Sequence, residues 1–144
     1  MPREFVESDV VLSNGLAVHY HEWPGDGPAM VLLHPTNGYG RIWEWLVEEF
    51  GDRFHIYAHD QRGHGRSARP DGDYSAQEYA EDLNLFMEHL GIEKAIIVGH
   101  SLGGRVAQVF SSKYPARVLA TVLMATHVAN FYQTTESVHA VMQD

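Results

Sequence analysis

The side chain with the clearest capacity for chemistry is that of Ser101, which lies at the centre of a G-x-S-x-G pattern. The five positions are Gly99, His100, Ser101, Leu102 and Gly103. An apolar run precedes the pattern and apolar residues at helical spacing follow it, so the pattern predicts a tight turn from strand to helix. A side chain at position 99 or 103 would collide with the packed neighbours of that turn. The N–H of Leu102 would face an oxyanion formed at the serine. We therefore predict that Ser101 is a nucleophile.

Strands and helices that alternate along the chain must position this turn. The Asn14-Gly15 pair predicts a hairpin, and short apolar runs predict further strands. The predicted strands are residues 5–12, 16–23, 29–33, 54–58, 95–98 and 118–125. The predicted helices are residues 43–50, closed by Gly51, a segment between the capping residue Ser75 and Gly91, and a segment from Leu102 to near Tyr114. This alternation predicts an α/β fold with a mostly parallel sheet.

Composition excludes several classes of protein. The 144 residues are 44% hydrophobic and 20% charged, which suits one globular domain. The absence of cysteine removes disulfides, thiol nucleophiles and thiolate metal sites. A net charge of -9 argues against a nucleic-acid partner. No apolar run is long enough to span a membrane, and the first residues do not form a signal peptide, so we expect a soluble cytoplasmic protein.

Three segments resemble a known family. They are Leu-Leu-His-Pro at residues 32–35, Asp-Gln-Arg-Gly-His-Gly-Arg-Ser at residues 60–67, and Gly-His-Ser-Leu-Gly-Gly at residues 99–104. In order and separation they resemble the N-terminal half of an α/β-hydrolase of the small-ester, lactone or peroxidase-like group. The resemblance implies helices on both faces of the sheet and a fold truncated after about the sixth strand. Residues 1–127 would form the N-terminal part of the core, and residues 128–144 the start of a cap.

The resemblance also assigns the site. It makes Ser101 the nucleophile and Leu102 one backbone donor of the oxyanion hole. The second donor would be Thr36, although Pro35 stands where the family usually has glycine. The family places its catalytic acid and histidine after later strands, and no residue here occupies either place. We therefore expect a fragment of a longer enzyme, or one half that needs a complementary C-terminal chain or a second copy of itself. The strand at residues 118–123 would then be an apolar edge with nothing to pair against, and we expect poor solubility as a result.

The implied function is hydrolysis of a small apolar ester or lactone through an acyl-enzyme, with no cofactor and no metal. A cofactor-free haloperoxidase or a carbon–carbon bond hydrolase would use the same turn. Epoxide opening and haloalkane dehalogenation are disfavoured, because in this fold they use an aspartate in place of the serine. A third hypothesis is a non-catalytic protein that binds a ligand or partner on a hydrolase scaffold.

The residues flanking the motifs are expected to support the site. His100 should point away from the serine hydroxyl and pack nearby, and His34 should hydrogen-bond loop backbone. His127 should line the pocket, although it could replace the missing base. We expect the loop after the fourth strand to be held in place by hydrogen bonds and a charge pair that involve Asp60, Arg62 and Ser67.

Two further patterns suggest other chemistry. His19 and His21 fall on one face of a strand at a spacing that suits a metal ion, but no third ligand is evident, so we expect two surface histidines. Residues 63–68 imitate the dinucleotide-binding pattern G-x-G-x-x-A. A turn at residues 69–72 follows where that motif needs a helix, which rules the motif out.

Overall fold

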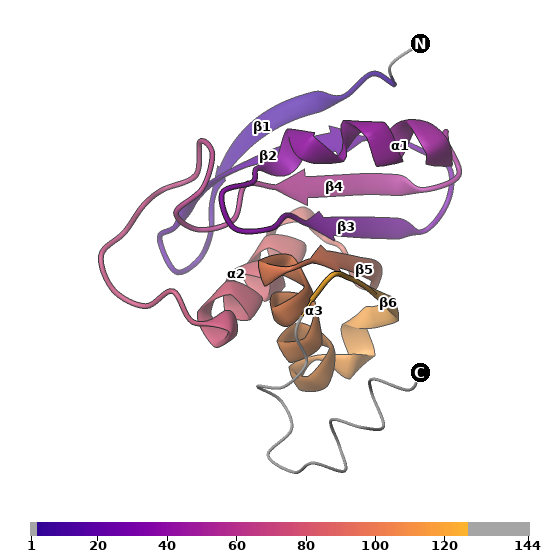
Figure 1. The fold of residues 1–144 in the computed structure, drawn as a ribbon. Helices are drawn as coiled ribbons and strands as arrows, with labels where there is room; N and C mark the ends of the chain where they lie inside the picture. Colours follow the sequence, from indigo (N-terminus) through magenta and orange to yellow (C-terminus); the bar gives the residue numbers. More distant parts are fainter. Residues whose placement is uncertain (1–2, 127–144) are drawn as a thin grey trace.

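A six-stranded sheet in the order β1-β2-β4-β3-β5-β6 forms the centre of the molecule (Figure 1). It is seen in a computed structural model that describes residues 3–126. The strands are β1 (Val6–Val11), β2 (Ala17–Trp23), β3 (Ala29–Leu33), β4 (His55–His59), β5 (Ala95–His100) and β6 (Val118–Met124). β1 and β2 pair antiparallel, as do β2 and β4, whereas the pairs β3–β4, β3–β5 and β5–β6 are parallel. The predicted mostly parallel α/β sheet is confirmed.

Helices cover both faces of the sheet. They are the 3₁₀ turn η1 (Gly40–Trp43), α1 (Glu44–Phe50), α2 (Ala76–Leu90), α3 (Leu102–Lys113) and the 3₁₀ turn η2 (Pro115–Arg117). α1 lies on one face, and α2 and α3 lie on the other (Figure 1). Because side chains alternate along a strand, β3 contributes to two cores. Val31 and Leu33 pack on the α2–α3 side, and Met30 and Leu32 pack on the α1 side.

The predicted turns and caps appear where the sequence puts them. Gly15 has φ 86° in the hairpin between β1 and β2. The Ser75 side chain accepts a hydrogen bond from the N–H of Glu78 at 3.2 Å and so caps α2. Gly91 ends that helix in the left-handed conformation, with φ 70° and ψ 24°.

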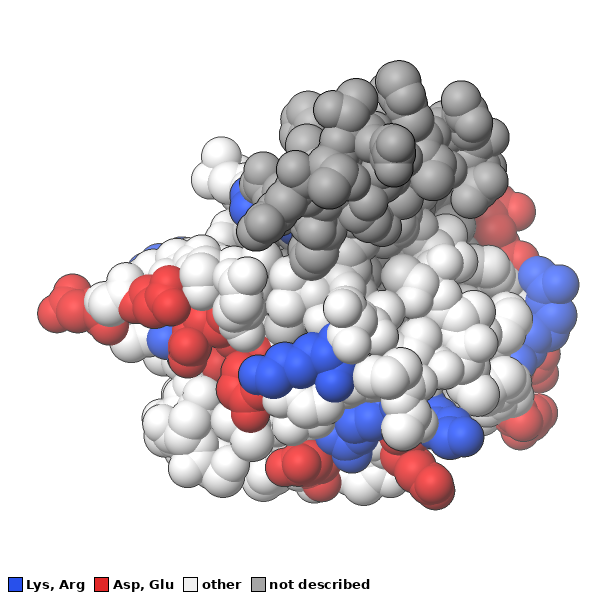
Figure 2. Space-filling model, turned by 90° about the horizontal axis from the view of Figure 1, so that it is seen from below, with Lys and Arg blue, Asp and Glu red and all other residues white. Residues whose placement is uncertain are grey.

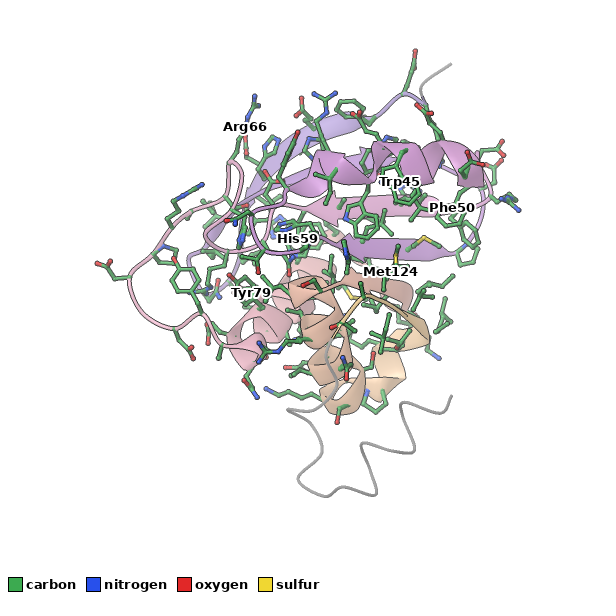
Figure 3. All side chains as sticks on the ribbon, viewed as in Figure 1. Trp45, Phe50, His59, Arg66, Tyr79 and Met124 are labelled. Carbon is green, nitrogen blue, oxygen red and sulfur yellow. The ribbon has the colours of Figure 1, made fainter. Side chains whose placement is uncertain are left out.

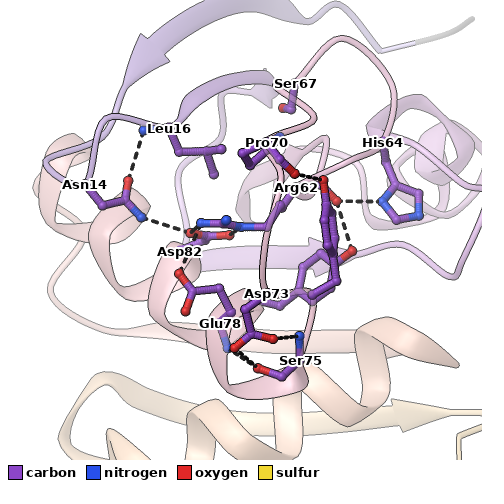
Figure 4. A network of polar contacts seen from close by, with 12 residues as sticks. Asn14, Leu16, Arg62, His64, Ser67, Pro70, Asp73, Ser75, Glu78 and Asp82 are labelled. Carbon is purple, nitrogen blue, oxygen red and sulfur yellow. Dashed lines mark hydrogen bonds and ion pairs between the residues drawn. The ribbon is translucent and has the colours of Figure 1, made fainter.

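A buried ion pair fixes the loop after β4 against α2 (Figure 4). The guanidinium of Arg62 donates from Nε and Nη2 to the two carboxylate oxygens of Asp82, each at 2.9 Å. Both side chains are buried. Glu78 pairs with the same guanidinium at 3.2 Å, and Asn14 from the hairpin donates to Asp82. The charge pair expected at Arg62 is therefore made with helix α2.

β6 forms one edge of the sheet and pairs only with β5 among the described residues. Several of its apolar residues are exposed: the exposed fraction is 51% for Leu119, 45% for Val122 and 39% for Leu123. This agrees with the apolar edge expected at residues 118–123. Elsewhere, basic and acidic side chains are interspersed on the face shown in Figure 2. Within residues 3–126, no helix combines the length and apolarity needed to cross a bilayer.

Candidate active site

Ser101 occupies the sharp turn between β5 and α3. β5 ends at His100 and α3 begins at Leu102, so a single residue makes the change of direction. Ser101 has φ 54° and ψ −111°, a conformation that non-glycine residues rarely adopt. Such backbone strain costs on the order of 1–3 kcal/mol and persists only where the surrounding structure enforces it. Among the described residues, Ser101 is one of three non-glycine residues with positive φ, together with Asn37 and Ala125, and it is the residue predicted to be the nucleophile.

Close backbone contacts explain the two glycines of the pattern. A Cβ atom on Gly99 would lie 2.2 Å from the carbonyl oxygen of Gly103. A Cβ atom on Gly103 would lie 2.0 Å from the carbonyl oxygen of Leu33. Both distances are far below an ordinary van der Waals contact, so only glycine lets α3 approach β3 and β5 this closely.

The end of β6 anchors the turn. The N–H of Ser101 donates to the carbonyl of Met124 at 3.0 Å, and the hydroxyl of Thr126 donates to the carbonyl of Ser101 at 2.8 Å. Met124 lies at the end of β6 (Figure 3). The carbonyl of Ser101 also accepts from the N–H of Arg105, which is the first hydrogen bond of α3. Three contacts therefore hold the backbone on both sides of the serine side chain, which is partly exposed.

The loop after β3 lies at the same edge of the sheet as Ser101. β3 and β5 are parallel neighbours with Leu33 opposite Gly99, so their carboxyl ends meet there. The N–H of Gly38 donates to the carbonyl of Pro35 at 2.9 Å, and Asn37 has φ 64°. This closes a tight turn that contains Thr36, whose side chain is exposed. Pro35 is therefore compatible with an ordered loop, and the roles of Thr36 and Leu102 as oxyanion donors remain predictions.

His34 is buried at the start of that loop with both ring nitrogens in use. Its Nδ1 bonds to the carbonyl of Pro35 at 2.8 Å, and its Nε2 accepts from the backbone N–H of Gln61 at 3.0 Å. Burial lowers the pKa of His34 to about 4. The ring is therefore neutral near pH 7 and holds loop backbone, as expected, and it has no free nitrogen to act as a base.

The remaining predicted site residues are placed as follows. His100 packs edge-on against Trp43, with ring centroids 6.5 Å apart, on the face of the sheet covered by α1. His127 and the predicted cap at residues 128–144 lie outside the described residues.

The segment at residues 60–67 acts as a brace for the loops around the site. The carboxylate of Asp60 accepts from the N–H of Gly40 at 2.7 Å and from the N–H of Arg66 at 2.9 Å. The hydroxyl of Ser67 donates to the carbonyl of Asp60. Gln61 adds a second bond to the loop after β3, from its side-chain amide to the carbonyl of His34 at 2.8 Å. The sequence did not single out Gln61, although it lies inside one of the three family motifs.

A family profile described as the alpha/beta hydrolase fold matches residues 28–143. The chain belongs to the α/β-hydrolase family. Among curated proteins, this α/β-hydrolase is 40% identical over 98 residues to a 2-(acetamidomethylene)succinate hydrolase of Mesorhizobium japonicum, a match that covers 68% of this chain and 35% of that protein. It is 31% identical over 130 residues to the bifunctional esterase/perhydrolase DCH of Acinetobacter calcoaceticus, which covers 89% of this chain and 47% of that protein.

Solved structures agree with this membership. The structure of E-2-(acetamidomethylene)succinate hydrolase matches with a TM-score of 0.82 and 33% identity, over 97% of this chain and 50% of that one. Est816, described as an N-acyl homoserine lactone degrading enzyme, matches with a TM-score of 0.75 and 29% identity, over 98% of this chain and 52% of that one. The chain thus spans about half or less of the length of these relatives. The predicted truncated fold agrees with that coverage.

Proposed function

We propose that this α/β-hydrolase chain carries the nucleophile of a serine hydrolase that cleaves a small ester or lactone through an acyl-enzyme on Ser101. The observation that carries the proposal is the strained turn at Ser101, held between β5, α3 and the end of β6. Enforced strain of this kind concentrates at functional sites. The names of the relatives, which include a hydrolase and an esterase/perhydrolase, support the reaction class.

The proposed chemistry follows from the position of the turn. The Ser101 hydroxyl oxygen attacks the carbonyl carbon of the substrate while a base removes its proton. The N–H of Leu102, which as the first residue of α3 has no acceptor within the helix, stabilises the resulting oxyanion together with the N–H of Thr36. The alcohol then leaves with a proton, and water releases the acid from the acyl-enzyme. The base and its acid partner are proposed to lie outside residues 3–126.

A second candidate rests on the same turn. The Acinetobacter calcoaceticus relative is named both esterase and perhydrolase. Attack of hydrogen peroxide, in place of water, on the acyl group at Ser101 would release a peracid. This agrees with the haloperoxidase alternative considered from the sequence. The two candidates share the acyl-enzyme and differ only in the molecule that resolves it.

Labelling with a fluorophosphonate probe, read by intact-protein mass spectrometry, tests the nucleophile. We expect one label per chain, lost in Ser101→Ala and retained in Ser112→Ala. Ser112 is a matched control because it is an exposed serine on α3, the helix that follows Ser101. Since the base is proposed to lie elsewhere, added imidazole should raise the labelling rate of the wild type and leave Ser101→Ala unlabelled.

Equal labelling of Ser101→Ala and the wild type would refute the nucleophile. Absence of labelling, with and without imidazole, would favour the non-catalytic binding protein instead. If the wild type is labelled as expected, product analysis with and without hydrogen peroxide separates the two enzymatic candidates, because only perhydrolysis yields a peracid.

A further inference from the structure

One face of the β1–β2 hairpin gathers side chains that bind metals. The antiparallel register places Glu7 opposite His21 and Asp9 opposite His19. Residues directly opposite each other point to the same face, as do residues two apart on one strand. Two imidazoles and two carboxylates therefore share a patch far along the chain from Ser101. The expectation that His19 and His21 are surface residues is wrong, since they are only 4% and 2% exposed.

The spacing of three of these groups fits a single ion. Oε1 of Glu7 lies 3.3 Å from Nε2 of His19 and 3.0 Å from Nε2 of His21. Glu7, His19 and His21 each offer one ligand atom, and the three atoms lie within 4.8 Å of one another. Zinc bonds to nitrogen and oxygen measure about 2.0–2.2 Å, so neighbouring ligands of a tetrahedral ion are about 3.3–3.6 Å apart. Only small side-chain movements would centre an ion among them.

Asp9 orients the first of the two rings. Its carboxylate lies 2.7 Å from Nδ1 of His19, so that nitrogen carries the proton and donates it. In the neutral ring the other nitrogen, Nε2, then presents its lone pair toward the carboxylate of Glu7. Those two electron-rich atoms repel each other unless a proton on Nε2 or a metal cation lies between them. A carboxylate that holds the far nitrogen of a histidine is the usual support of a metal ligand.

The second ring points to the same place. His21 Nδ1 is buried and has no hydrogen-bond partner among residues 3–126, while its Nε2 faces Glu7. A single proton on this ring therefore leaves one nitrogen unsatisfied whichever atom carries it. With the proton on Nδ1, the lone pair of Nε2 is available to a metal.

Space and charge around the three ligands allow a further ligand. They line a cavity of about 140 Å³ that also includes Asp60, Arg41 and Arg66. The charge of Arg41 is engaged by Glu44, with a 2.7 Å bond between them. The carboxylate of Asp60 accepts from the N–H groups of Gly40 and Arg66, so the cavity leaves room for a water molecule as the fourth ligand of an ion held by Glu7 and the two histidines.

We propose that Glu7, His19 and His21 bind one divalent transition-metal ion of the zinc type, with Asp9 as a positioning residue. Two imidazoles and one carboxylate suit zinc, cobalt, nickel or copper better than magnesium or calcium, which prefer oxygen ligands. The ion would join β1, an edge strand, to β2. The site is independent of the function proposed for Ser101, so either can fail without the other.

Titration of the metal-free protein with Co²⁺, followed by displacement with Zn²⁺, tests the site. We expect one equivalent of Co²⁺ to bind with the visible absorption of a low-symmetry site. Glu7→Gln, His19→Gln and His21→Gln should each weaken binding at least about 100-fold, and Asp9→Asn about 10–100-fold. His55→Gln is the matched control, because His55 also pairs with a carboxylate, Glu22, but has no second histidine.

Folding must be separated from ligation. Glu7 is the safest variant because its side chain is 39% exposed, and far-UV circular dichroism should show that Glu7→Gln keeps its secondary structure. One equivalent of Zn²⁺ should raise the melting temperature of the wild type and leave that of Glu7→Gln unchanged. Failure to bind one equivalent of Co²⁺ would overturn the proposal. The proposal would also be overturned if folded Glu7→Gln bound Co²⁺ as tightly as the wild type and His55→Gln do.

Discussion

Replacing Gly103 with alanine would place a new carbon 2.0 Å from the carbonyl oxygen of Leu33. An ordinary contact begins at 3.4 Å, so α3 and β3 would have to separate by roughly 3.4 − 2.0 = 1.4 Å. β3 cannot yield easily, because it is hydrogen-bonded on both sides and Leu33 is completely buried. Overpacking of a rigid site costs typically about 1–3 kcal/mol and occasionally more. We expect a loss of about 3 kcal/mol, at the upper end of that range.

Gly91→Ala is the matched control. Gly91 needs its left-handed conformation but has open space where a Cβ atom would lie, so alanine costs only the conformational term of about 1 kcal/mol. Gly103 has the opposite combination, because its φ is not positive and its surroundings are crowded. The pair therefore separates steric cost from backbone cost.

Urea unfolding followed by tryptophan fluorescence measures both variants, since Trp23 and Trp43 are buried and report on packing. With an m value of about 2 kcal/mol/M, the midpoint should fall by about 1.5 M for Gly103→Ala and by about 0.5 M for Gly91→Ala. A midpoint for Gly103→Ala equal to or above that of Gly91→Ala would contradict the reasoning. It would mean that the close approach of α3 to β3 is not required by the fold.

Three other predictions can be checked by the same urea unfolding. Asp82→Asn removes the carboxylate from the buried guanidinium of Arg62 and should lower the free energy of unfolding by about 3 kcal/mol. Glu78 is partly exposed, so Glu78→Gln should lower it by less than about 1 kcal/mol. Equal losses would argue against a stabilising role of the Arg62–Asp82 ion pair. Burial lowers the pKa of His34 to about 4 and that of His59 to about 3, so below pH 6.5 the unfolded chain binds protons that the folded chain refuses. The free energy of unfolding should be at its full value above pH 6.5 and should fall toward pH 4 by about 1.4 kcal/mol per pH unit for each of the two histidines. His34→Gln should remove the contribution of one histidine to that slope. A flat profile would show that the rings are not buried in the neutral form. Ser75→Ala should cost about 1 kcal/mol through loss of the cap of α2, and an unchanged midpoint would show that the cap is unimportant.

Local sequence patterns predicted the fold because each pattern has a local cause. The hairpin follows from the Asn14-Gly15 turn, α2 from the Ser75 cap, and the turn at Ser101 from a buried strand followed by an amphipathic helix. The boundaries of strands shifted by one or two residues, as at β4, which begins at His55 and not at residue 54. Hydrogen bonding between neighbouring strands sets those boundaries, and no local pattern reports it.

Contacts between distant segments were harder to foresee. Asp82, the partner of Arg62, lies on α2, 20 residues further along the chain, and only the packing of that helix on the sheet brings the two side chains together. The acidic neighbours of His19 and His21 lie on the adjacent strand. Pairing the ends of the two predicted strands, residue 12 with residue 16, and extending that register would have placed residue 7 opposite 21 and residue 9 opposite 19, so that signal was present in the sequence. The catalytic base offered no signal among the three motifs, and its proposed location is outside residues 3–126.

The anchoring of Ser101 by the end of β6 orders events during folding. Two of the three backbone contacts around the serine come from Met124 and Thr126, so β5 and α3 alone do not fix its orientation. As the chain leaves the ribosome, the segment that carries the hydroxyl emerges more than twenty residues before the segment that locks it. The turn at Ser101 therefore reaches its final geometry only once β6 has joined the sheet.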